Sequence, residues 1–188
     1  PKKYPFPFPK HTRVAGYIGA IDYRLDVSLL VRLTRRHQTW RFALIGPISY
    51  DFLSESDRRK LRMLLTSANV FHDSIAPEFI PDLLRQCSVT VIPYRTSLAF
   101  NRYAFPMKTM EYLYAKKRVI TSPIIELRGY SPLIRMAGNI SEWERELEES
   151  FKIPLTAKEK RLARRIAMSH TWDKKILKML SLLSQTSE

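Results

Sequence analysis

The chain has 188 residues, 45% of them hydrophobic, and a formal net charge of +14 at pH 7. This length and apolar content correspond to about one ordinary folded domain and exclude a largely disordered protein. A single cysteine, Cys87, excludes an intrachain disulfide and favours a reducing compartment. No apolar run approaches the roughly 20 residues that span a bilayer, and no signal-peptide pattern opens the chain. The four histidines have no metal-ligand spacing, so no metal site is expected.

The positive charge is concentrated at the two ends of the chain. Residues 1–13 have four basic side chains and no acidic one, and residues 152–188 have nine basic and three acidic ones. Such an excess predicts an anionic partner, which is nucleic acid, anionic lipid or a phosphorylated ligand.

Residues 1–12 read PKKYPFPFPKHT, in which prolines alternate with aromatic residues. This pattern cannot form a helix and resists a central strand. We therefore predict a basic extended tail or interdomain linker over 1–12 and one folded domain over 13–188, with C-terminal helices over 157–183.

From residue 13 on, short apolar runs alternate with segments of helical periodicity. Asp26 is the predicted acidic cap of the first helix, and Pro106 stands at a plausible first helical position. The predicted elements, in chain order, are a strand at 14–18, a helix at 27–33, a strand at 42–45, a helix at 55–65, a strand at 69–71, a helix at 78–87, a strand at 89–92, a loop at 94–105, a helix at 107–115, strands at 118–121 and 133–136, and helices at 141–151, 157–169 and 172–183.

Alternating strands and helices favour an α/β fold, and near-continuous apolar strands are typical of a sheet covered on both faces. We predict a doubly wound, mostly parallel Rossmann-like sheet with helices on both faces. In such folds the ligand binds beyond the carboxyl ends of the strands, near the point where the strand order reverses. The candidate segments are therefore the loops that follow residues 18, 45, 71, 92 and 121.

The loop after the first strand contains Gly16, Gly19 and Arg24. Glycines at a strand end let the backbone approach a phosphate, and an arginine can bind a diphosphate through a charge-assisted fork. The full G-x-G-x-x-G pattern and the P-loop pattern are both absent. A tight strand–helix turn with a surface arginine is the alternative interpretation of this segment.

Lys108 and Glu111 are three residues apart, so they share one face at the start of a predicted helix. A carboxylate there can accept hydrogen bonds from ribose hydroxyls, and a lysine can contact a phosphate. The alternative is a weak surface ion pair between the two side chains. The preceding loop combines Tyr94, Asn101 and Tyr103 with two arginines, which suits a sugar, a nucleotide or single-stranded nucleic acid, or an ordinary exposed loop.

Several segments follow one another in an order that resembles a known family. They are VAGYIGAIDYRLDVSLL, RFALIGP, NVFH, PEFIPDLLRQCSVTVIPY, FPMKTMEYLYAKKRVITSP and SHTW. Together they resemble the C-terminal, donor-binding domain of GT-B glycosyltransferases of the group 1 or family-4-like class, from Val14 to about Leu183. The most specific block is Pro106-x-Lys108-x-x-Glu111-Tyr-Leu.

The resemblance implies a role for particular residues. The turn at Gly19 and Ala20 approaches the donor diphosphate, Arg24 and Lys108 stabilise the leaving group, and Glu111 holds the nucleotide ribose. The base is expected near 72–75, which includes His72, and near Tyr94, and backbone amides near Phe105 and Met107 are expected to contact phosphate. Many family members have a second glutamate eight positions before the first. That position is Tyr103 here, and Asn101 is the candidate replacement for the missing carboxylate.

The implied activity is transfer of a sugar from a nucleotide-diphosphate sugar to a saccharide or lipid-linked acceptor. The resemblance implies that the anomeric configuration of the sugar is retained and that no metal or other cofactor is needed. One Rossmann-like domain is half of a GT-B enzyme, so we expect the N-terminal acceptor domain to be missing. The expected location is cytoplasmic, with the basic ends on an anionic membrane surface. Two alternatives are a basic α/β module that binds nucleic acid and a non-catalytic domain that kept the fold. The first is disfavoured because no RNA-recognition or KH motif is present.

Overall fold

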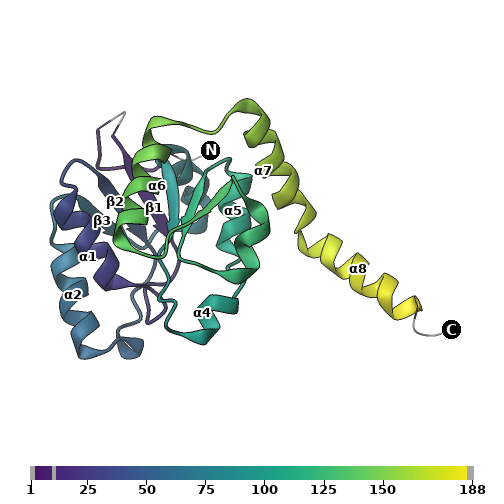
Figure 1. The fold of residues 1–188 in the computed structure, drawn as a ribbon, viewed down its shortest axis with the longest axis horizontal. Helices are drawn as coiled ribbons and strands as arrows, with labels where there is room; N and C mark the ends of the chain where they lie inside the picture. Colours follow the sequence, from purple (N-terminus) through teal and green to yellow (C-terminus); the bar gives the residue numbers. More distant parts are fainter. Residues whose placement is uncertain (1–2, 10–11, 186–188) are drawn as a thin grey trace.

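The computed structural model describes residues 3–9 and 12–185, and its centre is a six-stranded sheet (Figure 1). The strand order is β3-β2-β1-β4-β5-β6, and every neighbouring pair is parallel. The predicted Rossmann-like sheet is therefore confirmed, and it is parallel throughout. The strands are β1 (Val14–Ile18), β2 (Arg41–Ile45), β3 (Val70–Asp73), β4 (Val89–Ile92), β5 (Val119–Thr121) and β6 (Ile134–Met136).

The strand order reverses next to β1. The chain passes from β1 to β2 and β3 on one side, then returns to add β4 against the other side of β1. The loops after β1 and β4 consequently diverge at the carboxyl edge of the sheet and leave a crevice between them. This switch point is where the fold itself predicts a ligand.

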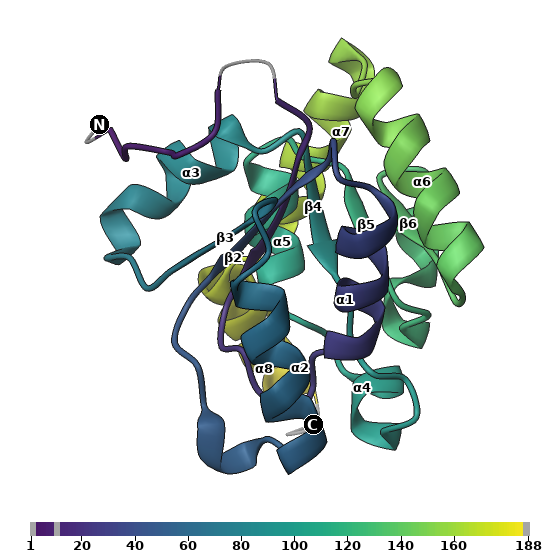
Figure 2. The same ribbon diagram turned by 90° about the vertical axis from the view of Figure 1, so that its left-hand side faces the viewer.

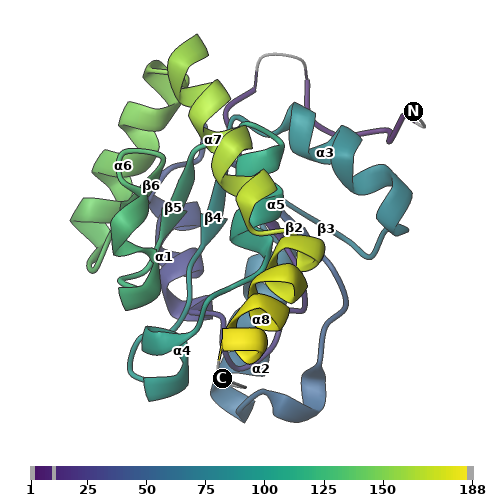
Figure 3. The same cartoon turned by 90° about the vertical axis from the view of Figure 1, so that its right-hand side faces the viewer.

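Helices cover both faces of the sheet, as Figures 2 and 3 show from opposite sides. On one face, α1 packs against α2 and α6, and on the other α5 packs against α7, with α3 beside them. The bounds are α1 (Val27–Arg36), α2 (Glu55–Leu65), α3 (Ile80–Gln86), α5 (Lys108–Tyr114), α6 (Ile140–Lys152) and α7 (Ala157–Ser169).

Local sequence signals set the helix starts. The Asp26 carboxylate accepts a hydrogen bond from the Leu29 N–H at 2.8 Å, which confirms the predicted acidic cap of α1. Thr156 and Glu159 form a reciprocal capping box at the start of α7, whose bounds match the prediction.

The structure differs from the prediction in the segments around β4. The predicted helix at 78–87 begins as a 3₁₀ turn, Pro77–Phe79, and continues as α3, in whose first turn Pro81 has no N–H to satisfy. The predicted loop at 94–105 contains a short helix, α4 (Ala99–Tyr103). Two further 3₁₀ segments, Tyr50–Phe52 and Ile125–Tyr130, follow β2 and β5.

Residues 3–9 form neither a helix nor a strand, as predicted, but they are not a free tail. The rings of Tyr4, Phe6 and Phe8 each lie against Phe71 on β3. The Tyr4 N–H donates a hydrogen bond to Asp82 on α3 at 2.7 Å, and the Tyr4 hydroxyl bonds to Asp73. Aromatic burial thus holds this segment on the domain.

The last helix, α8 (Trp172–Gln185), extends away from the rest of the domain (Figure 1). Trp172 is 68% exposed and Leu177 is 65% exposed. Ile176 and Leu180 are also at least half exposed, so the described apolar side chains of this helix do not pack on the domain, and the Leu183 side chain lies outside the described part of the structure.

Candidate functional site

A pocket of about 510 Å³ lies at the switch point, beyond the ends of β1 and β4. The turn after β1, the segment after β4 and the start of α5 provide most of its wall. The residues that line it are Ile18, Gly19, Ala20, Arg24, Ile80, Tyr94, Phe100, Ala104, Phe105, Pro106, Met107, Lys108 and Glu111.

Lys108 places a positive charge inside this pocket. Its Nζ lies 3.9 Å from the centre of the Tyr17 ring and 5.5 Å from that of Tyr94. Burial, helped by the Arg24 cation and opposed by the Asp22 and Glu111 carboxylates, lowers the pKa of Lys108 to about 7. Among the residues that the structure describes, Lys108 has no hydrogen-bond acceptor and no ion pair. The surface ion pair with Glu111 that the sequence allowed is not formed.

Gly19 makes room for the Lys108 ammonium. The backbone of Gly19 has φ +140°, and a Cβ there would collide with Lys108 Nζ. The Gly19 N–H donates to the Ile45 carbonyl at 2.8 Å, which ties the turn to β2. Gly46, with φ +139°, is equally constrained, because a Cβ there would collide with the Gly19 carbonyl oxygen. Glycine is required at both positions because the turn after β1, the turn after β2 and the Lys108 side chain come into close contact here.

Arg24 lines the same pocket, but a carboxylate already compensates its charge. Its Nε lies 3.0 Å from both oxygens of Asp22, and its Nη2 lies 2.6 Å from Oδ2. The hydrogen bond to Asp22 raises the pKa of Arg24, and its guanidinium carbon lies 6.0 Å from the Tyr94 ring centre. Sequence reasoning did not assign a role to Asp22, which orients Arg24 toward the pocket.

Glu111 is exposed on α5, one turn after Lys108. It lines the switch-point pocket and also a neighbouring, mostly apolar groove of about 670 Å³ between α3, α5 and the end of α7. Ile80 likewise borders both cavities. Glu111 therefore stands between a cationic pocket and a larger apolar groove.

Three predicted site residues do not line the pocket. The Nδ2 of buried Asn101 donates to the carbonyls of Arg24 (3.1 Å) and Arg95 (2.9 Å), so this amide braces the loop. His72 lies on β3 with its Nε2 3.0 Å from the Gly46 carbonyl oxygen. Tyr103 is 59% exposed and lies beneath the Arg102 guanidinium, outside the pocket. Gly19, Ala20, Tyr94, Phe105 and Met107 do line it.

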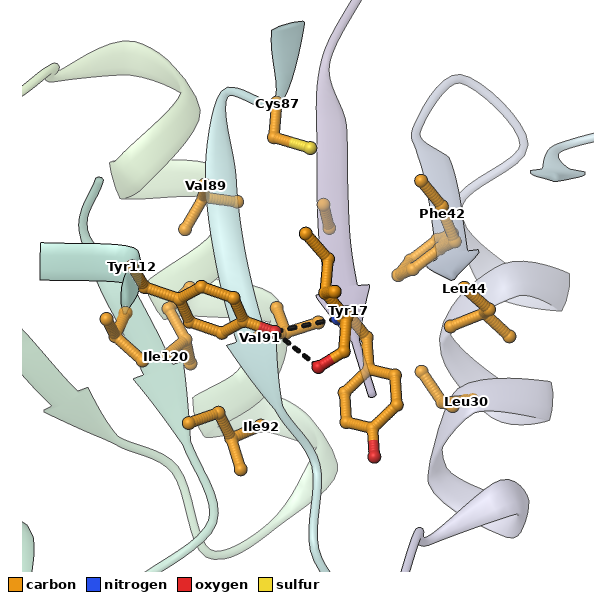
Figure 4. Packing of buried hydrophobic residues seen from close by; sticks show 14 of the residues in the cluster. Tyr17, Leu30, Phe42, Leu44, Cys87, Val89, Val91, Ile92, Tyr112 and Ile120 are labelled. Carbon is orange, nitrogen blue, oxygen red and sulfur yellow. Dashed lines mark hydrogen bonds between the residues drawn. The ribbon is translucent and has the colours of Figure 1, made fainter. Parts of the chain in front are cut away.

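Two buried tyrosines were missed because their sequence context resembles ordinary core. Tyr17, on β1, supplies the ring beneath Lys108. Tyr112 reaches from α5 to the end of β1, where its Oη accepts a hydrogen bond from the Ile18 N–H at 2.7 Å and lies 3.3 Å from the Ile18 carbonyl (Figure 4). The only available signal was that each hydroxyl needs a partner once buried.

Several solved structures have a similar fold. A structure of Anabaena Alr3699/HepE in complex with UDP matches with a TM-score of 0.66 and 16% identity, over 95% of this chain and 50% of that one. An E. coli trehalose-6-phosphate structure with bound UDP-2-fluoro glucose matches with a TM-score of 0.68 and 13% identity, over 90% and 44%. The chain has the fold of a GT-B glycosyltransferase domain.

A curated protein from Bacillus subtilis (strain 168), named "Putative teichuronic acid biosynthesis glycosyltransferase TuaH", is 28% identical over 108 residues. The match covers 57% of this chain and 26% of that protein, so it spans about a quarter of that protein's length. No protein-family model matches the chain. In the described ranges 3–9 and 12–185, no helix has the length and apolarity needed to cross a membrane.

Proposed function

We propose that this GT-B domain is the donor-binding part of a glycosyltransferase. It would bind a nucleotide-diphosphate sugar. The sugar would then pass to a saccharide or lipid-linked acceptor with retention of its anomeric configuration. The observation that carries the proposal is the Lys108 ammonium, which lies in the switch-point pocket without an anionic partner among the described residues. A diphosphate supplies the missing negative charge.

The positions of the lining residues suggest how the donor lies. With its diphosphate against Lys108 and the turn at Gly19, on the open side of the pocket, the ribose reaches Glu111, whose exposed carboxylate can accept hydrogen bonds from both hydroxyls. The base then points toward Ile80 and the apolar groove between α3 and α5. This placement revises the expectation that His72 lies at the base.

The same residues can assist departure of the diphosphate. Negative charge develops on the leaving group as the glycosidic bond breaks, and fixed cations lower the energy of that state. Asp22 holds Arg24 in place before the donor arrives, while Lys108 is free to pair with the leaving group. In this proposal no metal is required for the step, and the acceptor-binding half is supplied by another part of the whole protein.

The first experiment is a binding panel on the 188-residue chain with UDP, GDP, ADP, dTDP and a short single-stranded oligonucleotide, each at low and high salt. UDP comes first because it is bound in the similar structure of HepE. A ligand at about 100 times its dissociation constant stabilises a fold by about 2.7 kcal/mol. A salt-tolerant thermal shift with one nucleoside diphosphate supports the proposal. A shift only with the oligonucleotide, lost at high salt, favours the nucleic-acid alternative, and no shift favours a non-catalytic domain.

We also propose that α7 and α8 contact an anionic membrane surface. The exposed side of α7 has five basic residues, and α8 combines lysines with a row of exposed apolar side chains that starts at Trp172. This combination is typical of helices that lie in the membrane interface, where each basic residue contributes about 1 kcal/mol. Sedimentation with phosphatidylcholine vesicles that contain phosphatidylglycerol should be strong at low salt. Equal sedimentation without phosphatidylglycerol would contradict this proposal.

A further inference from the structure

The rim of the switch-point pocket contacts the junction between α7 and α8. Phe105, which lines the pocket just before α5, lies parallel to the His170 ring, with ring centres 5.7 Å apart and planes inclined by 4°. Tyr130 completes a cluster of three rings, 6.2 Å from Phe105 and 5.9 Å from His170. The three side chains come from separate segments of the chain: the loop before α5, the 3₁₀ segment after β5, and the end of α7.

Both nitrogens of the His170 ring are engaged. Nδ1 lies 3.1 Å from the Ile166 carbonyl oxygen and 3.2 Å from the Ser169 hydroxyl oxygen. The carbonyl can only accept, and the Ser169 hydroxyl donates its hydrogen to the same carbonyl at 2.7 Å, so Nδ1 is the donor. Nε2 of the neutral ring therefore accepts from the Tyr130 hydroxyl, 3.0 Å away. Burial raises the pKa of Tyr130, which keeps this hydroxyl protonated and able to donate. The ring is consequently fixed in one orientation against Phe105.

The first turn of α8 also reaches the pocket rim. Lys175 Nζ lies 3.9 Å from the sulfur of Met107, a pocket residue, and 6.0 Å from the centre of the Phe105 ring. The same ammonium lies 5.2 Å from the Trp172 ring centre. Phe105 and Met107 therefore connect the pocket to the start of a helix that otherwise extends from the domain.

We propose that His170 is a positioning residue of the donor pocket, which holds Phe105 and the entry into α5 in place and thereby couples the pocket to the first turn of α8. The identity of the ligand rests on the proposed function. His170 also borders the apolar groove next to Glu111. A loosened Phe105 would let the segment that precedes Lys108 move, so donor affinity would fall although His170 does not touch the diphosphate.

The first arm of the test measures UDP affinity by calorimetry. His170→Ala removes the ring and its hydrogen bonds, and Tyr130→Phe removes one hydroxyl and keeps its ring. We expect each change to weaken UDP binding by about fivefold or more, the effect of one lost hydrogen bond, and the second change to add little in the His170→Ala background. His37→Ala is the matched control, because His37 stacks on Trp40 and contacts Glu144 away from the pocket. It should leave the affinity unchanged.

The second arm separates positioning from a general loss of stability. Trp40 and Trp143 are both 2% exposed, whereas Trp172 is 68% exposed, so acrylamide quenching of tryptophan fluorescence reports on Trp172. UDP should reduce this quenching in the wild type and not in His170→Ala, because the link between the pocket and the first turn of α8 is lost in the variant.

The possible outcomes separate the two proposals. If the wild type binds none of UDP, GDP, ADP and dTDP, the proposed function fails and this inference fails with it. If the wild type binds UDP, and His170→Ala keeps both the affinity and the change in quenching, this inference alone is overturned.

Discussion

The pKa of Lys108 makes diphosphate binding depend on pH. Burial and the Arg24 cation lower this pKa to about 7, against the opposing effect of Asp22 and Glu111. A bound diphosphate favours the charged lysine, so above pH 7 binding must take up a proton and the affinity falls. Between about pH 7 and about pH 9 the protonated fraction drops about fiftyfold, and the affinity can drop by the same factor, about 2.3 kcal/mol.

Calorimetry with UDP measures this effect directly. Titrations near pH 8 in buffers of different ionisation enthalpy should show uptake of about 0.9 proton per UDP bound. Lys108→Met keeps the length of the side chain and removes its charge, so binding should be weaker and this pH dependence should disappear. Lys60→Met is the matched control, because Lys60 contacts Ser28 between α1 and α2, away from the pocket. A Lys108→Met protein with the wild-type pH profile would refute the reasoning.

Three further substitutions test other parts of the site. Glu111→Ala should weaken nucleoside diphosphate binding by roughly 1.5–3 kcal/mol. The fold should stay intact because this side chain is exposed. Unchanged affinity in calorimetry would show that Glu111 does not bind the ligand. Tyr112→Phe leaves the buried polar groups at the end of β1 without their partner. It should therefore lower the unfolding free energy by roughly 1–3 kcal/mol in urea titrations, and an unchanged midpoint would contradict this role. Gly19→Ala should weaken binding at least about tenfold, because φ +140° disfavours alanine and the added Cβ displaces Lys108. Its control is Gly129→Ala, where a Cβ meets no atom within 4 Å; equal losses in the two proteins would show that the effect is not local.

The fold could be predicted from sequence because its signals are local. Buried parallel strands need continuous apolar runs, and those runs fell within a few residues of the observed strands. The start of α1 at Asp26 and the bounds of α7 depend on capping residues next to the helix. The short helix α4 was missed because tertiary contacts to the backbone, through Asn101, hold it in place.

The site was only partly predictable because side-chain direction depends on tertiary structure. Helical spacing placed Lys108 and Glu111 on one face, but it could not show that the lysine turns inward over Tyr17 while the glutamate stays exposed. His72 was expected at the base because of its place in sequence. Its strand lies one position further from the switch point, since β2 separates β3 from β1.

The central position of β1 also bears on how the protein folds. The hydrogen bond between Ile18 and Tyr112 joins residues 94 positions apart, and the pairing of β1 with β4 spans a similarly long segment. Such long-range contacts form late and slow the folding of parallel sheets. The pocket is complete only when both contacts exist, so a nucleotide bound there would slow global unfolding and leave the refolding rate nearly unchanged.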